Sequence, residues 1–176
     1  IERLWRRSVS RRVVHLAPMN VLVVPSAAGR RAERPLPVLR EVLVATDLSE
    51  LGDRAVPHAM ALLPEGGVLH LAYVRPPRPL TTPVIALHPT APADRQVPVQ
   101  DIVATLEALV PRDAARRGIS ARTHVLEGDV AEAICAAAER LAVDAVCLAS
   151  RARRPMSAVV LGSATLGVLA RSRRPV

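Results

Sequence analysis

From residue 42 onward, short apolar runs alternate with longer stretches of helical periodicity, and this alternation limits the fold more than any other feature. The apolar runs have the length of buried strands, and in the stretches between them apolar residues recur every three or four positions. Strands that alternate with helices are typical of a mainly parallel α/β sheet covered by helices on both faces. The predicted strands span residues 42–45, 68–74, 121–126 and 145–149.

The segments between the predicted strands carry signals for helices. Pro57 lies within the first helical stretch, about residues 51–63, and is expected to kink it unless it falls in the first turn. Asp129, followed three residues later by Glu132, resembles a capping box and predicts the start of another helix. Ser163 is expected to begin the last helix.

Composition limits the partners. The net charge of +8 suggests nucleic acid, but every basic residue is arginine, and one Trp and one Tyr leave almost no surface on which bases could stack. No apolar run approaches the roughly 20 residues of a membrane-spanning helix, and no secretory signal opens the chain. We therefore expect a cytoplasmic protein without a nucleic-acid or membrane partner.

Cysteine and histidine spacing predicts no metal site. Cys135 and Cys147 match no close metal or redox spacing and are interpreted as small buried apolar residues. The histidines form no ligand pair at helical spacing: His15, His58, His70, His88 and His124. No set of catalytic side chains stands out either, so we lean against an enzyme.

The two ends of the chain resemble each other. Residues 7–21 align with residues 162–176, and the repeat predicts a helix followed by a strand in the first copy, whereas the second copy stops before its strand. The first residue is Ile rather than Met, which suggests a fragment or a processed product. Identical residues occupy three aligned pairs: Ser8/Ser163, Val13/Val168 and Val21/Val176.

This repeat predicts three parts. Residues 1–25 would be the last helix and strand of a preceding copy, residues 26–40 a linker, and residues 41–176 a domain that lacks its final strand. The missing strand would leave an open sheet edge. We expect residues 21–24 to fill that edge or to pair with a neighbouring chain.

Three small residues, with two and then nine residues between them, precede the last helix. The pattern is Ala149-x2-Ala152-x9-Gly162-Ser163, in which small side chains let the backbone approach a ligand. A helix start after such a loop favours phosphate, because free N–H groups and the helix dipole attract anions.

Together, these segments resemble the universal stress protein family. The resemblance covers residues 41–176 and rests on three segments: the strand that ends in Thr46-Asp47, the turn at Gly128, and Gly162-Ser163 before a helix. It implies a doubly wound five-stranded sheet of order 3-2-1-4-5, and a ligand at the switch point beyond the carboxyl ends of strands one and four. Family members that bind ATP carry Gly-x2-Gly-x9-Gly-Ser/Thr, and here two of these glycines are alanine.

The resemblance also implies which residues would hold ATP with Mg. Asp47 would accept a ribose hydroxyl, and backbone near Val74 would meet the adenine. Arg153 would add a charge-assisted contact. The full predicted set is Ala45, Thr46, Asp47, Val74, Gly128, Ala149, Ala152, Arg153, Gly162, Ser163, Ala164 and Thr165.

Alternative interpretations stay open for these residues. Asp47 would instead cap the first helix, Gly162-Ser163 would simply start the last one, and the arginines would belong to a solvated loop. The leading hypothesis is a stress-response regulatory module whose nucleotide site is weakened or lost. The alternatives are a pure assembly module that pairs with a preceding tandem copy or as a homodimer, and a nucleotide-dependent α/β enzyme, for which slow ATP hydrolysis is conceivable.

Overall fold

The computed structural model describes residues 9–17, 19–25, 38–75, 97–150 and 162–176, in which strands and helices alternate. Most of the predicted linker 26–40 and of the proline-rich stretch between β2 and α5 lies outside these residues. The strands are β1 (Glu41–Ala45), β2 (Val68–Arg75), β3 (Ser120–Glu127) and β4 (Ala145–Leu148). The helices are α2 (Val9–Leu16), α3 (Glu50–Asp53), α4 (Ala55–Leu62), α5 (Val99–Ala108), α6 (Val130–Arg140) and α7 (Ser163–Arg171), with a 3-10 turn at Ala115–Arg117.

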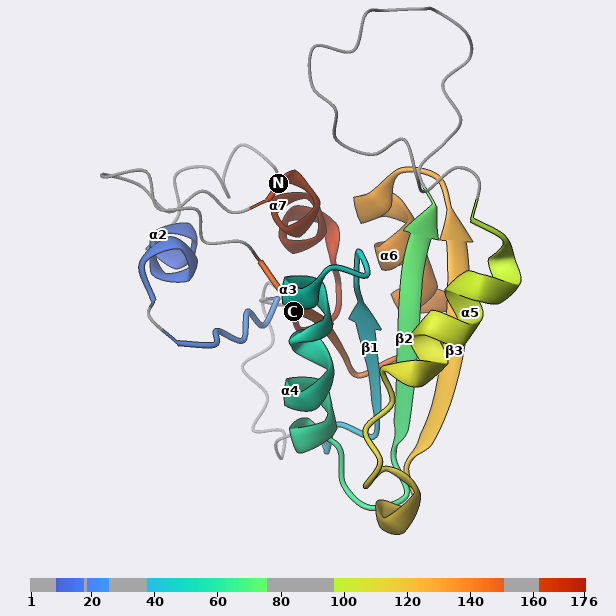
Figure 1. Ribbon diagram of the computed structural model, residues 1–176. Helices are drawn as coiled ribbons and strands as arrows, with labels where there is room; N and C mark the ends of the chain where they lie inside the picture. The colour runs from blue at the N-terminus through green and yellow to red at the C-terminus, as the bar shows by residue number, and fades with distance from the viewer. Residues whose placement is uncertain (1–8, 18, 26–37, 76–96, 151–161) are drawn as a thin grey trace, which may run out of the picture.

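The strands form one parallel sheet of order β3-β2-β1-β4 (Figure 1). The expected order is confirmed for these four strands, 3-2-1-4, and the correction concerns the fifth, since the described residues form four strands and not five. At the place of the fifth, the Val146 N–H donates to the carbonyl of Pro175 at 2.8 Å. Pro175 has no N–H with which to continue a ladder, so these residues lie against β4 without forming a strand.

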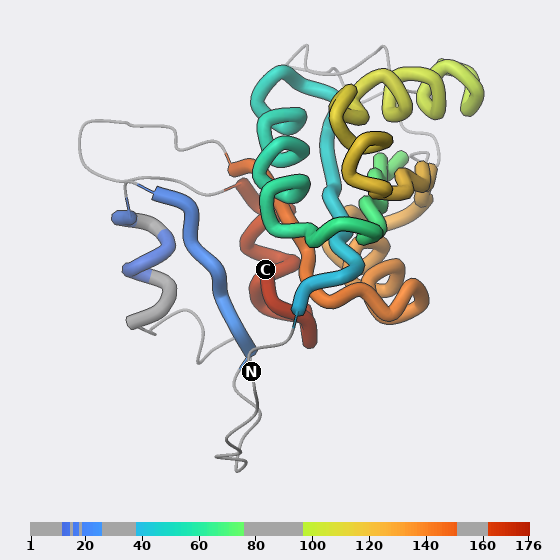
Figure 2. Tube along the Cα trace, turned by 90° about the horizontal axis from the view of Figure 1, so that it is seen from below, coloured from blue at the N-terminus to red at the C-terminus, as the bar shows by residue number. Residues whose placement is uncertain are grey.

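Two apolar cores lie on opposite faces of the sheet. Val42 and Val44 of β1 pack into the core beneath α4 and α5, whereas Leu43 packs into the core beneath α6 and α7. All three side chains are fully buried. Figure 2 shows the two helical layers on either side of the sheet. The doubly wound arrangement expected from the sequence is therefore present.

Pro57 divides the first helical stretch into two helices. It is the third residue of α4, within the first turn, and its ring excludes the helical hydrogen bond to the carbonyl of Asp53. The chain therefore breaks at Arg54, between α3 and α4. The predicted cap of α6 is confirmed, since the Asp129 carboxylate accepts from the Glu132 N–H at 3.0 Å.

Residues 21–25 lie beside the C-terminal residues (Figure 2). Val23 and Val176 exchange both backbone hydrogen bonds, at 2.7 and 3.0 Å, as an antiparallel hydrogen-bonded pair does. We expected residues 21–24 to fill the open edge or to pair with a neighbouring chain. Their described backbone bonds join Val23 to Val176 rather than to β4, and pairing with a neighbouring chain stays a prediction.

Gly167 sets how closely α7 approaches α6. A Cβ atom at this position would lie 2.6 Å from the Ala131 Cβ. Glycine to alanine within a helix normally adds about 1 kcal/mol of stability. Here we expect Gly167→Ala to lower the free energy of unfolding by about 1–3 kcal/mol, because the helices must move apart. Chemical denaturation measures this change.

The control exchanges the two residues. Ala131→Gly combined with Gly167→Ala moves the methyl group from one helix to the other, and the two changes in helix propensity nearly cancel. The double variant should recover most of the lost stability. A single Gly167→Ala variant that is more stable than the parent chain would contradict this packing.

Candidate functional site

A cavity of about 220 Å³ lies at the carboxyl ends of β1 and β4. From β1 the chain winds outward through β2 to β3, then crosses back to β4 on the other side of β1. This reversal is the switch point at which doubly wound sheets bind ligands. The cavity is lined by Ala45, Thr46, Asp47, Ser49, Leu51, Gly52, Tyr73, Val74, Val130, Ile134, Leu148, Ala149, Ala164 and Thr165.

The polar wall of the cavity is the turn from β1 to α3. Thr46 is buried, and its hydroxyl donates to Asp53 Oδ1 at 2.7 Å while accepting from the Leu48 N–H at 2.9 Å. Asp47 Oδ1 accepts from the backbone N–H of Ser49 at 3.1 Å and from its hydroxyl. The turn is therefore held from within by its own side chains, which presets the position of the Asp47 carboxylate.

Ser49, and not Asp47, caps the first helix. The Ser49 hydroxyl accepts from the Gly52 N–H at 3.1 Å, as an N-cap side chain does. Both bonds to Asp47 use Oδ1, and the residue is exposed at the cavity. The alternative interpretation of Asp47 as the helix cap is therefore wrong, although Asp47 orients the cap.

Two residues of this turn are constrained, Leu48 by its backbone angle and Gly52 by the space around its Cα atom. Leu48 has a φ of +57°, the left-handed region that is rare for a residue with a branched side chain. A Cβ atom at Gly52 would lie 2.4 Å from Asp47 Oδ1 and 2.7 Å from Thr46 Oγ1. Only glycine at position 52 lets α3 approach the two polar side chains this closely.

The last helix contributes the opposite wall. Ala164 and Thr165, in the first turn of α7, line the cavity, whereas the preceding Gly162 and Ser163 are exposed and do not. Gly162 has a φ of −59°, which any residue can adopt, and open space lies where its Cβ would be. Gly162 is the N-cap residue of α7, and Ser163 begins the helix as predicted.

Alanine replaces glycine at positions 149 and 152, and the structure shows for Ala149 whether this strains the backbone. Among the described residues, only Leu48 and Ala142 have a positive φ outside glycine, so Ala149 carries no left-handed strain. Ala149 lines the cavity directly after β4. Ala152 and Arg153 lie outside the described residues, as do the neighbouring arginines.

An apolar wall completes the cavity, and the sequence revealed only part of it. Ala45 and Val74 were expected there and do line the cavity; Ala45 ends β1 as predicted, whereas β2 continues one residue past Val74 to Arg75. Gly128 is not among the lining residues; its φ of +118° serves the turn after β3. The residues that sequence reasoning missed are Ser49, Leu51, Gly52, Tyr73, Val130, Ile134 and Leu148.

One signal could have found two of the missed residues. Val130 and Ile134 lie four positions apart at the start of α6, so they share one face of the helix. That helix begins next to the predicted turn at Gly128, at the same edge of the sheet. The pattern indicates an inward face, but the alignment of that face with the end of β1 depends on how the helix crosses the sheet.

The described residues offer little other chemistry. Within them, no group of three or more His, Cys, Asp or Glu side chains could hold a metal ion, and no helix is long and apolar enough to cross a bilayer. Burial raises the pKa of the Cys147 thiol, which contacts the Ala55 carbonyl at 3.7 Å. Burial also raises the pKa of Cys135, although Arg171 acts in the opposite direction. Neither thiol is favoured as a thiolate, which fits their interpretation as small apolar residues, although both are half-buried rather than buried as expected.

The fold and the cavity define a doubly wound α/β domain with a candidate ligand site at its switch point. The model of the universal stress protein family matches residues 39–176, so the chain belongs to that family. No curated protein sequence matches the chain.

Several solved structures share the fold. Hypothetical protein MJ0577 is 19% identical, with a TM-score of 0.58 over 80% of this chain and 94% of that one. A universal stress protein from Archaeoglobus fulgidus is also 19% identical, with a TM-score of 0.55 over 78% of this chain and 96% of that one. A universal stress protein in complex with cAMP is 20% identical, with a TM-score of 0.53 over 78% of this chain and 94% of that one. At these identities the similarity concerns the fold alone.

The close approach at Gly52 gives a test of the turn. We expect Gly52→Ala to lower the free energy of unfolding by about 1–3 kcal/mol, because the new methyl group would overlap the Asp47 carboxylate and the Thr46 hydroxyl. Thermal or chemical denaturation measures the loss. Gly162→Ala is the control, since that Cβ meets open space at a φ of −59°. Equal effects of the two substitutions would contradict the described turn.

Proposed function

We propose that this chain is a stress-response regulatory domain that binds an adenine nucleotide weakly in the cavity between β1, β4 and α7. The observation that carries the proposal is the meeting of Asp47, Ala149 and Ala164 at one cavity. These residues come from three separate segments that the sequence pattern had assigned to one site. Their meeting at the switch point supports a ligand there.

The chemistry of the walls matches the parts of a nucleotide. Val74, Ile134 and Leu148 offer apolar contact for a flat base. The exposed Asp47 carboxylate is an acceptor suited to sugar hydroxyls. The first turn of α7 presents N–H groups without helical partners, which favour phosphate. The related structure in complex with cAMP is consistent with this class of ligand.

Of the two alanines that replace glycine, only Ala152 could still weaken nucleotide binding through backbone strain. Alanine in the left-handed region costs about 1–2 kcal/mol, but Ala149 does not adopt that region. Any such cost would therefore come from Ala152 alone. A penalty of about 1.4 kcal/mol lowers affinity roughly tenfold. We accordingly expect binding in the weak range rather than complete loss.

Calorimetry on the full chain tests the proposal with four ligands: ATP, ATP with Mg²⁺, cAMP and adenosine. Ala164→Leu should weaken binding strongly, because the larger side chain fills part of the cavity from the first turn of α7. Ala108→Leu is the matched control, an identical substitution at an exposed position at the end of α5. We expect at least a tenfold loss of affinity for the first variant and no change for the second.

Three outcomes decide between the functions. Heat uptake or release that Ala164→Leu reduces and Ala108→Leu retains supports a nucleotide site. No binding at millimolar concentrations of all four ligands contradicts it. ATP turnover that Asp47→Ala abolishes would instead favour the nucleotide-dependent enzyme.

As a second candidate function, we infer that α2 and residues 21–25 form an assembly surface. The specific observation is a contrast between two residues aligned by the internal repeat. Val168 of α7 is completely buried against α6, whereas Val13 of α2 is 51% exposed. The apolar face of α2 therefore lacks the cover that its counterpart has.

Residues 21–25 also expose apolar side chains. Because Val23 bonds to Val176, the backbone N–H groups of Leu22 and Val24 point to the opposite edge. Their side chains are 56% and 63% exposed. An exposed apolar edge with outward backbone groups favours pairing with another strand. A preceding tandem copy or a second copy of this chain would supply that strand.

Sedimentation over a range of concentrations tests the assembly surface. We expect the full chain to associate, and Leu22→Glu to shift it toward the monomer, because charge repels at an apolar edge. Leu62→Glu is the control at another exposed leucine, 48% exposed on α4. A chain that stays monomeric throughout, or equal effects of the two substitutions, would contradict the proposal.

A further inference from the structure

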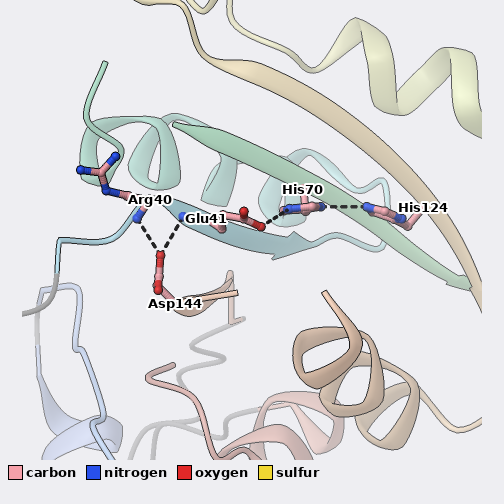
Figure 3. A network of polar contacts seen from close by, with 5 residues as sticks. All are labelled: Arg40, Glu41, His70, His124 and Asp144. Atoms are coloured by element: carbon pink, nitrogen blue, oxygen red, sulfur yellow. Dashed lines mark hydrogen bonds and ion pairs between the residues drawn. The ribbon is translucent and has the colours of Figure 1, made fainter. Parts of the chain in front are cut away.

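A line of three polar side chains crosses β1, β2 and β3 on the face covered by α6 (Figure 3). Glu41 begins β1, and its Oε2 lies 3.2 Å from His70 Nε2. His70 Nδ1 lies 3.0 Å from His124 Nε2, and the two rings stack with centroids 5.2 Å apart. His70 is completely buried, in the middle of a parallel sheet. None of these residues lines the nucleotide-type cavity.

The start of β1 is fixed independently of the histidines. Asp144, just before β4, accepts from the backbone N–H groups of Arg40 and Glu41 at 2.7 and 2.9 Å (Figure 3). These bonds place the Glu41 side chain at the end of the line. The carboxylate can therefore orient the buried imidazole of His70.

Hydrogen-bond accounting gives one arrangement for the neutral pair. An ionised Glu41 is only an acceptor, so the hydrogen of His70 lies on Nε2 and is donated to it. His70 Nδ1 is then the acceptor, and the Nε2–H of His124 donates to it. Both nitrogens of His70 and the Nε2 of His124 thereby have a hydrogen-bond partner.

One added proton preserves this line, but two do not. With one proton added to the neutral pair, one of the two facing nitrogens still carries a hydrogen, and the other still accepts a hydrogen bond from it. With a proton on both rings, His70 Nδ1 and His124 Nε2 both carry hydrogens and face each other at 3.0 Å. The hydrogen bond is then lost, and two positive charges lie at stacking distance.

The surrounding charges act on the same pair. Glu41 on β1 is negative, whereas Arg122 on β3 and Arg140 at the end of α6 are positive and oppose a charge on His124. Burial, then His70, then these two arginines hold the pKa of His124 below its usual value of 6.5. The environment therefore favours a neutral His124 near pH 7.

We propose that His70 and His124 act as one proton-binding unit, whose second protonation breaks the side-chain hydrogen bond between β2 and β3 and makes this domain acid-sensitive. The affected edge is covered by α6, whose first half contributes Val130 and Ile134 to the cavity. The unit is distinct from the proposed nucleotide site and does not depend on it.

The direction of the pH effect follows from linkage. In the unfolded chain His124 titrates near its usual pKa of 6.5, whereas in the folded chain it takes up its proton at a lower pH. Between these two values the unfolded chain binds more protons, so lowering the pH favours unfolding. The stabilising contribution is complete above about pH 6.5 and is lost as the pH falls through the folded pKa of His124.

Nitrogen NMR of the histidine rings in the full chain tests the coupling directly. We expect both rings to carry their hydrogen on Nε2 at neutral pH, and the pair to titrate in two steps separated by about one pH unit or more. His58, exposed on α4 and outside this line, is recorded in the same spectra as a reference. Titration of His70 and His124 independently of each other would overturn the proposal.

Stability against pH provides the second measurement. His124→Gln keeps an N–H donor for His70 Nδ1 but cannot take up a proton. We expect its melting temperature to match that of the parent chain at pH 7.5 and to fall less between pH 7.5 and 5. His58→Gln is the matched control and should follow the parent chain throughout. An unchanged acid loss in His124→Gln would overturn the proposal, and the NMR measurement decides the matter if that variant does not fold.

Glu41→Gln tests whether the charge of Glu41 favours the first protonation of the histidine pair or whether Glu41 only accepts a hydrogen bond. The amide oxygen can still accept from His70 Nε2–H, but the negative charge that favours the first proton is gone. We expect the first NMR step to move to lower pH, with the Nε2–H tautomer of His70 retained. A first step that stays in place would contradict the part assigned to Glu41.

Discussion

The burial of β1 on both faces is the constraint on which the remaining structure depends. Val42, Leu43 and Val44 are fully buried, and they alternate between the two cores. Such a strand must have neighbours on both edges, because its N–H and C=O groups have no access to water. β2 and β4 supply these partners, and the helices on either face follow from the need to cover both sides. β1 also places the two polar regions of the domain, since the histidine line starts from its first residue and the cavity opens at its last.

The turn after β1 converts this buried strand into a candidate site. Thr46 turns its hydroxyl inward to Asp53, and Asp47 holds Ser49, which in turn caps α3. Gly52 lets the helix come close enough for these bonds. The carboxylate of Asp47 is thus oriented before any ligand arrives, which lowers the ordering cost of binding. The same bonds make the turn a structural element, so the residues proposed to contact a ligand also stabilise the fold.

Much of the fold could be predicted because it depends on local patterns. Apolar runs identified β1 to β4, Asp129 identified the start of α6, and Pro57 marked a break in the first helical stretch. Part of the site could also be predicted, since residues at the carboxyl ends of β1 and β4 meet in any sheet of this order. Tyr73, Val130 and Ile134 could not be assigned in this way. Their place at the cavity depends on how β2 and α6 lie against the end of β1, which no local pattern specifies.

The sequence by itself determined the α/β class, the order of the elements and the positions of Thr46, Asp47 and Ala149 at strand ends, because periodicity and chain order act over short distances. Only the tertiary structure decided that Ser49 caps α3, that Ala149 avoids a left-handed backbone and that Val23 pairs with Val176. It also joined Glu41, His70 and His124, which are far apart in the chain and follow no motif spacing. The physical reason is the register of the parallel sheet. Side chains on neighbouring strands meet according to which backbone groups pair, and that pairing is settled only when both cores are packed.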